Sequence, residues 1–163
     1  MNKQLSSNEL KQKIIEFLRQ HKEGSLATCM NNIPRSSPVQ YFLGDDLNIY
    51  IQSAGGEKFK AIKQNPNVCL LVNTEYINYR KIKGVQIFGT ATTSLEDESL
   101  FEEAIKYCPE PWLLSSERDK LKIIKIVPKE IVYLDSLKDG DRTKQILKQD
   151  QVLIKEDQIP AMA

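Results

Sequence analysis

The first apolar residues of the chain repeat with the period of a helix. Four of them are spaced so that they would lie along one side of a helix: Leu10, Ile14, Phe17 and Leu18. Ser6 and Glu9 stand before them at the spacing of a capping box, in which each side chain accepts a hydrogen bond from the other residue's backbone. We therefore predict a helix over residues 8–22 that ends before Gly24. The only histidine, His21, falls in the last turn, where an imidazolium suits the negative end of the helix dipole, so we favour a capping role over a catalytic one.

The next part of the chain shows short runs of strand-forming residues separated by turn residues. The runs cover residues 25–30, 37–43 and 47–52. Asn31-Asn32 stands between the first two runs, and Gly44 begins the polar turn between the last two. This pattern predicts three antiparallel strands joined as a meander.

Beyond the meander, helices and strands alternate before a polar C-terminal segment. We expect a helix over 57–64, strands over 67–74 and 85–94, a second long helix that begins near Ser94 and Asp97, and a last strand over 121–135. Gly89 predicts a bulge or a close approach of two backbones. Pro128 predicts a kink in the last strand and a place at a sheet edge, because proline has no N–H to donate. The order indicates a small β-barrel with peripheral helices and not a doubly wound sheet.

The composition is that of an ordinary globular domain, and it narrows the possible functions. The 163 residues are 40% hydrophobic and 28% charged, and a net charge of +1 gives no broad electrostatic surface for nucleic acid or an anionic membrane. The chain shows neither the ~18 to 20 continuous apolar residues that cross a bilayer nor the apolar run of a signal peptide, so we expect a cytoplasmic protein. Three widely separated cysteines fit neither a disulfide framework nor a zinc site, and buried, reduced thiols are expected: Cys29, Cys69 and Cys108.

One segment has the residue types of a phosphate site. The sequence lacks the glycine-rich motifs of dinucleotide and nucleoside-triphosphate sites, but Gly55 and Gly56 precede the helix predicted at 57–64. Their backbone can approach a ligand closely, and Ser53, Lys58 and Lys60 add a hydroxyl and two positive charges. This combination suits a phosphate monoester. The alternative is a plain strand-to-helix turn with two solvated lysines.

Several short motifs follow one another along the chain in a recognisable order. They are the small-residue strand at 24–28, a Pro-Arg…Pro-Val strand at 34–41, a strand ending in Ser53, the spacing Lys58, Ile62, Pro66, an apolar strand at 68–72, the triplet Gly89-Thr90-Ala91, and the closing strand at 121–135. In this order they resemble the pyridoxamine 5'-phosphate oxidase-like, FMN-binding split-barrel family over roughly residues 8–135. The resemblance implies a mainly β protein with peripheral helices around a six-stranded antiparallel split barrel. Residues 1–135 would form the FMN-binding domain, and residues 136–163 a polar C-terminal tail or a helical extension.

The resemblance also implies which residues would bind FMN. Lys58 and Ser53 would hold the FMN phosphate, with Arg35 and Lys60 as further candidates. Residues of one strand would lie along the isoalloxazine ring or steady negative charge on its reduced form: Ser36, Ser37, Pro38, Val39 and Gln40. Members of the family are homodimers with FMN in the groove between subunits, so two more residues would reach the flavin across the interface, Gln86 and Trp112. Trp112 has an alternative role as an anchor in the dimer or the core.

The chain departs from the family's pyridoxine-phosphate oxidases at positions that affect the substrate. Glu57 stands where those enzymes have an arginine beside the phosphate-binding lysine, and residues 83–86 replace their Arg-Gln-Val-Arg pattern. Their C-terminal Arg-Leu-x-Pro segment, which binds the substrate phosphate, is absent from the sequence. We therefore do not expect pyridoxamine phosphate as the substrate.

The resemblance leaves several functions open. The first is an FMN-dependent oxidoreductase that acts on an unidentified small molecule with a reduced nicotinamide as electron donor, and in which the flavin supplies the electron chemistry. The second is a non-catalytic flavin-binding, flavin-buffering or stress-related protein. The third is a split barrel that binds haem or deazaflavin, although a haem ligated by histidine would have to use His21. A pure interaction module is a fourth. We name no catalytic side chain and expect no metal, nucleic-acid or membrane site.

Overall fold

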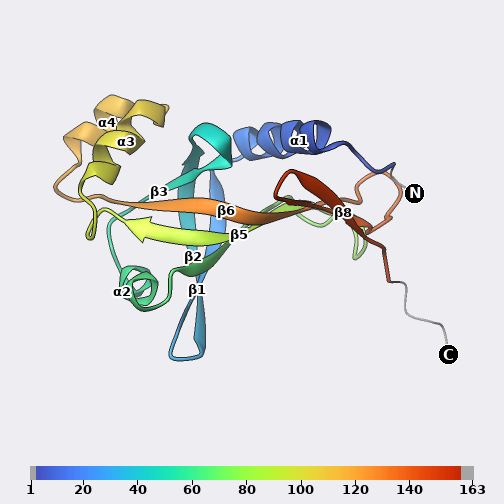
Figure 1. The fold of residues 1–163 in the computed structure, drawn as a ribbon, viewed down its shortest axis with the longest axis horizontal. Coiled ribbons are helices and arrows are strands. Elements are labelled where there is room, and N and C mark those ends of the chain that lie inside the picture. The colour runs from blue at the N-terminus through green and yellow to red at the C-terminus, as the bar shows by residue number, and fades with distance from the viewer. Residues whose placement is uncertain (1–2, 159–163) are drawn as a thin grey trace.

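The computed structural model describes residues 3–158, which form a mainly β structure with peripheral helices (Figure 1). Its strands are β1 (Glu23–Met30), β2 (Ile33–Leu43), β3 (Ile49–Ser53), β4 (Asn67–Asn73), β5 (Lys83–Thr93), β6 (Lys122–Asp135), β7 (Lys144–Lys148) and β8 (Gln151–Lys155). Its helices are α1 (Ser7–Gln20), α2 (Glu57–Gln64), α3 (Ser99–Tyr107) and α4 (Pro111–Ser116), with a 3-10 turn at Asp45–Leu47.

The strands form one antiparallel sheet that closes partly on itself. The sheet order is β3-β2-β1-β4-β5-β6-β7-β8, and β3 also pairs with β6. Strands β1 to β6 therefore form a ring of six, as predicted, and β7 and β8 extend the sheet beyond the ring. The mainly β fold class with a six-stranded antiparallel barrel is confirmed.

Strand β6 both closes the barrel and carries the C-terminal hairpin. It pairs with β5 along one edge, while its other edge pairs first with β3, at residues 122–126, and then with β7, at residues 130–134. Pro128 lies between these two partners, where a residue without an N–H is tolerated. The pairing with β5 shifts register between Phe88 and Gly89, so the predicted bulge is confirmed. The predicted edge position of β6 is wrong, because this strand has neighbours on both sides.

Helix α1 begins with the predicted capping box. The Glu9 N–H donates to Ser6 Oγ at 3.2 Å, and the Ser6 N–H donates to Glu9 Oε1 at 3.2 Å. The apolar side of the helix is buried in the main core with residues of the barrel strands. His21 directly follows Gln20, the last residue of α1, and its Nδ1 lies 2.9 Å from the Phe17 carbonyl oxygen.

The region after β5 holds two short helices in place of the single long helix predicted. Helix α3 ends at Tyr107, and Pro111 starts α4, at a position where a proline costs no helical hydrogen bond. Both helices contribute to a second core that the sequence did not reveal. Its buried members are Phe42, Tyr50, Leu100, Phe101, Ala104, Leu114 and Ile123.

The described part of the polar segment is a β-hairpin, where we expected a tail or a helical extension. Strand β7 pairs with β6 and β8 pairs with β7. The sequence of β7 does not show the alternation of apolar and polar residues that marks a strand, because β7 buries Gln145 beside Leu147 and leaves Ile146 half-exposed. The buried Gln145 amide donates to the Lys3 carbonyl at 3.1 Å and accepts from the Leu5 N–H at 2.9 Å. The N-terminal segment thus satisfies a polar side chain that no strand pattern would predict. In the described residues, no helix is long and apolar enough to cross a membrane.

Candidate functional site

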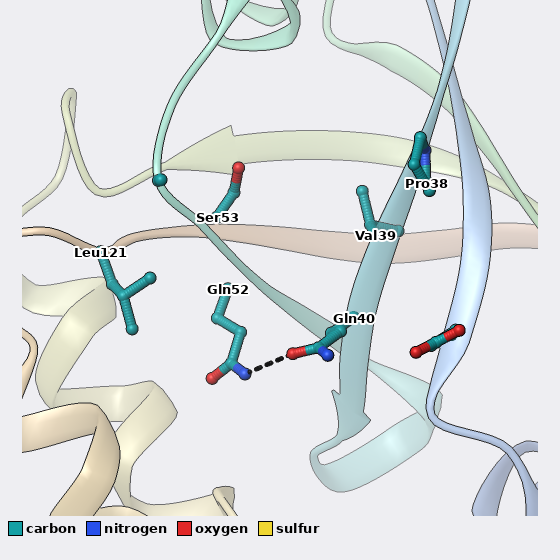
Figure 2. A pocket seen from close by; sticks show the side chains of 8 residues that line it. Pro38, Val39, Gln40, Gln52, Ser53 and Leu121 are labelled. Atoms are coloured by element: carbon teal, nitrogen blue, oxygen red, sulfur yellow. Dashed lines mark hydrogen bonds between the residues drawn. The ribbon is translucent and has the colours of Figure 1, made fainter.

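Part of the predicted site comes together in a hollow between β2 and the end of β3, which we call the Ser53 hollow. Its volume is about 380 Å³, and its lining includes Pro38, Val39, Gln40 and Ser53. In Figure 2, the β2 residues stand on one side of the hollow, and Ser53 and Leu121 stand on the other. The pairing of β2 with β3 therefore brings together residues that lie far apart in the sequence.

Two glutamine side chains form a hydrogen-bonded pair in this hollow, and the sequence predicted only one of them, Gln40, as a site residue. Gln52 Nε2 donates to Gln40 Oε1 at 3.1 Å (Figure 2). Gln40 and Gln52 are opposite each other in the β2–β3 pairing, so their side chains emerge from the same side of the sheet. Glu23 also lines the hollow and is opposite Gln40 on the other side of β2. The register of β1, β2 and β3 brings Glu23, Gln40 and Gln52 side by side. No local sequence motif predicts this register.

The turn from Ser53 to Lys58, which we call the phosphate turn, has a backbone that requires its glycines. Gly55 has φ 136° and Gly56 has φ 113°, values that residues with a side chain rarely adopt. The N-cap residue of α2, Gly56, makes no side-chain capping bond. The first N–H groups of an α-helix have no partner within the helix, so this open end of α2 offers donors to an anion.

Two polar side chains of the phosphate turn converge on one carbonyl oxygen. Lys58 Nζ donates to the Gly55 carbonyl at 2.8 Å, and Ser53 Oγ donates to the same oxygen at 3.2 Å. The hydroxyl and the ammonium group are therefore close enough to contact one small anion. Burial lowers the pKa of the Lys58 ammonium below that of an exposed lysine. Because burial removes solvent from its charge, a bound anion would stabilise the charged form.

A second lysine at this turn comes from a distant part of the sequence. Lys122, the first residue of β6, is opposite Ser53 in the β3–β6 pairing, and its Nζ donates to the Ala54 carbonyl at 3.3 Å. A Cβ atom placed on Gly55 would lie 3.8 Å from the same Nζ. Lys122 thus adds a positive charge to the phosphate turn. The sequence gives no local pattern for it, because only the closure of the barrel brings β6 to this position.

The other candidates on β2 and α2 lie outside the Ser53 hollow. Arg35 and Ser36 are exposed on the outer half of β2, which pairs with β1 alone, and Lys60 is exposed on α2. Side chains alternate along a strand, so Ser37 and Val39 cannot face the same side as Pro38. Val39 is only 6% exposed and packs in the main core. Of the predicted row on β2, Ser36, Pro38 and Gln40 therefore present their side chains on the outer side, and of these three Pro38 and Gln40 line the Ser53 hollow.

The two residues predicted to act across a subunit interface lie elsewhere on the molecule. Trp112 on α4 is 68% exposed. Gln86 on β5 lines a separate hollow of about 300 Å³, which we call the Gln86 cavity. The strand pairings place Gln86 and Pro38 in one row across β2, β1, β4 and β5, with three strand spacings between them, or about 14 Å. A single chain does not bring Gln86 to the Ser53 hollow.

Comparison with known proteins assigns the chain to a family. Residues 10–135 match the model of the family described as pyridoxamine 5'-phosphate oxidase. The chain belongs to this family. The match spans the six barrel strands and their helices, whereas β7 and β8 lie beyond it.

Relatives of this pyridoxamine 5'-phosphate oxidase family member include stress proteins. General stress protein 26 of Bacillus subtilis (strain 168) is 29% identical over 140 residues, which cover 85% of this chain and 96% of the relative. A solved structure from Listeria innocua that carries the family's name is 28% identical, covers 77% of this chain and 98% of its own, and has a TM-score of 0.58. A FAD-binding protein from Mesorhizobium loti, 20% identical with a TM-score of 0.52, covers 78% of this chain and 90% of its own and shows likeness of fold alone.

The structure also places the cysteines and the possible metal ligands of this family member. The described residues contain no group of three or more His, Cys, Asp or Glu side chains that could hold a metal ion. The cysteines are free, as predicted, but each is half-buried where full burial was expected. Burial raises the pKa of the Cys69 thiol, which disfavours the reactive thiolate.

Proposed function

We propose that this chain binds FMN and acts, as a homodimer, as an FMN-dependent oxidoreductase on a small molecule, with a reduced nicotinamide as electron donor. The observation that carries the proposal is the phosphate turn, where a hydroxyl and an ammonium group meet at the open end of a helix. Membership of the family supports the choice of a flavin. The FAD-binding protein of the same fold is a further, weaker support.

The residues present fit the phosphate of FMN. Ser53 and the first N–H groups of α2 supply hydrogen-bond donors, and Lys58 and Lys122 supply two positive charges for a dianion. Gly55 and Gly56 leave the approach to the backbone open, because neither has a Cβ atom. Glu57 lies within this turn as an exposed acidic residue, and its negative charge opposes phosphate binding.

The Ser53 hollow would then hold the adjoining part of the cofactor. Bound flavin supplies the electron chemistry, and the chain's own groups bind and orient it. The pairing of Gln52 with Gln40 uses one amide atom of each side chain and leaves Gln52 Oε1 and Gln40 Nε2 without a partner in the described residues. One acceptor and one donor are thus available for the polar edge of a ring. Pro38 and Leu121 add apolar surface to the same hollow.

A second copy of the chain would complete this site. The outer face of the sheet carries exposed apolar residues on several strands: Leu71 (37% exposed), Phe88 (38%) and Leu153 (47%). Exposed apolar side chains on one face of a sheet support its use as an interaction surface. Because Gln86 lies in the same face, a two-fold partner packed on it would bring its Gln86 toward the Ser53 hollow of the first copy. We therefore place the homodimer interface on this face.

The Phe88→Asp variant tests this interface. We expect wild-type protein to sediment at twice the chain mass of 18.7 kDa, and the variant to need about tenfold more protein to dimerise, because a carboxylate in an apolar interface loses its hydration. Sedimentation velocity over a concentration series measures both. Leu95→Asp is the matched control, since Leu95 is 61% exposed but lies outside the sheet strands. Equal dimerisation of both variants would place the interface on another face.

The cofactor itself is tested by the visible absorption spectrum of the purified protein. We expect a two-band flavin spectrum and the release of FMN on denaturation, identified by chromatography. A Soret band in the spectrum would show that the bound cofactor is haem and not a flavin. A colourless protein that FMN does not reconstitute would contradict the proposal and leave the fold and family unchanged.

A further inference from the structure

Side chains from β4, β5 and β6 form the floor of the Gln86 cavity on the outer face of the sheet. Leu71, Gln86 and Val132 are opposite one another on β4, β5 and β6, so their side chains form one row. In the next row, Gly84 stands between Asn73 and Leu134. Gly84 has no side chain, and a Cβ atom placed there would lie 3.1 Å from Asn73 Cβ and 3.2 Å from the Val72 carbonyl oxygen, so β4 and β5 approach closely at this point. The cavity lies over these two rows and includes Leu71, Val132 and Leu134 in its lining.

One end of the cavity is positively charged. Lys144 continues the second row on β7, opposite Leu134, and Arg142 lies just before that strand. Among the residues that the structure describes, no acidic residue lines the cavity. Lys144 is half-buried and has neither an ion pair nor a side-chain hydrogen bond within the described part of the chain. Its charge is therefore uncompensated at the wall of an apolar pocket.

Arg142 is held at the same end by its neighbours. Its backbone N–H donates to Asp157 Oδ2 at 3.1 Å, and its Nη1 lies 3.4 Å from the Tyr79 carbonyl oxygen. Asp157 also accepts a hydrogen bond from Arg80 and forms an ion pair with it, so this carboxylate is already shared. The adjoining hollow, which shares Arg142 and Lys144 with the cavity, is lined by four cationic and two acidic side chains. The surplus of charge at this end is positive.

We propose that the Gln86 cavity binds a small organic anion, with its apolar or aromatic body over Leu71 and Val132 and its negative group at Lys144 and Arg142. A volume of about 300 Å³ is at the lower limit of pockets for small molecules, which favours a compact ligand of one or two rings. In the proposed homodimer, Gln86 would face the partner's Ser53 hollow. The anion would then be the class of substrate taken up beside the flavin, and this last step alone rests on the proposed function.

Calorimetric titration with two isosteric probes tests the cavity. The probes are 1-naphthoate and the neutral 1-naphthamide, and the protein is used as purified. We expect 1-naphthoate to bind about tenfold more tightly than the amide to wild type, because a charge-assisted hydrogen bond discriminates between them. Lys144→Gln should remove this preference. Lys148→Gln is the matched control, because Lys148 lies on the same strand and is exposed outside the cavity.

The outcomes separate this inference from the proposed function. Equal binding of both probes, or an unchanged preference in Lys144→Gln, would overturn the anion site, as would absence of binding at millimolar concentration. If FMN binds and 1-naphthoate does not, the cavity proposal fails alone. If 1-naphthoate binds as expected and FMN does not, the anion site stands and its assignment to a flavin substrate falls.

Discussion

Replacing Lys58 with alanine is expected to weaken FMN binding about 10- to 150-fold. A hydrogen bond to a charged group contributes about 1.5 to 3 kcal/mol, and this range corresponds to that change in Kd. The estimate applies here because Lys58 is partly desolvated and its Nζ lies at the open end of α2. Titration of FMN into the apoprotein, followed by absorbance or fluorescence, measures the effect.

Lys63→Ala is the matched control for this variant. Lys63 lies on the same helix but is exposed in its last turn, so its loss should leave the FMN affinity unchanged. A Lys58→Ala protein that binds FMN as tightly as wild type would remove Lys58 from the site. Equal losses in both variants would show that the net charge of α2 matters and not the position of one lysine.

The pH dependence of FMN binding provides a second test of the role of Lys58. Burial lowers the pKa of Lys58, so its charge is lost at a lower pH than that of an exposed lysine. As the pH rises through that pKa, the wild-type affinity should fall toward the value of Lys58→Ala. The variant lacks the group and should show a smaller fall over the same range, which separates this lysine from titration of the flavin.

Local patterns in the sequence predicted most elements of the barrel. The helix predicted at 57–64 is α2 to the residue, because Gly56 and Pro66 mark its ends in the sequence itself. The capping box at Ser6 is equally local and is also present. Strand pairing is different, since it depends on partners that no short segment specifies. For that reason Pro128 predicted an edge strand, whereas β6 simply changes partner there.

The candidate site shows the same division between local and distant information. Ser53 and Lys58 share one turn, so a motif could place them together. Lys122 lies 69 residues further along the chain than Ser53, and it reaches that turn only through the pairing of β3 with β6. Gln86 lies in its own cavity, and its relation to the Ser53 hollow depends on a second copy. Such contacts cannot be predicted from spacing within one sequence.

Gly89→Ala is expected to lower the free energy of unfolding by about 3 kcal/mol. A Cβ atom on Gly89 would lie 2.3 Å from the Val127 carbonyl oxygen and 3.0 Å from Ile126 Cγ2, so the backbones of β5 and β6 would have to move apart. Overpacking of this kind costs about 1 to 3 kcal/mol, and the upper end applies because the obstacle is backbone and not a flexible side chain. Chemical denaturation followed by circular dichroism measures the loss.

The position of Gly89 gives this variant a meaning beyond stability. Gly89 is opposite Pro128 at the bulge, where β6 leaves β3 and begins to pair with β7. A forced shift there would loosen the closure of the barrel, which also positions Lys122 at the phosphate turn. Thr92→Ala is the control, because Thr92 is exposed on the same strand and its loss should change the stability by less than about 0.5 kcal/mol. A Gly89→Ala protein as stable as this control would show that β5 and β6 can move apart at the bulge at little cost. The close approach of the two backbones at Gly89 would then not be required for closure of the barrel.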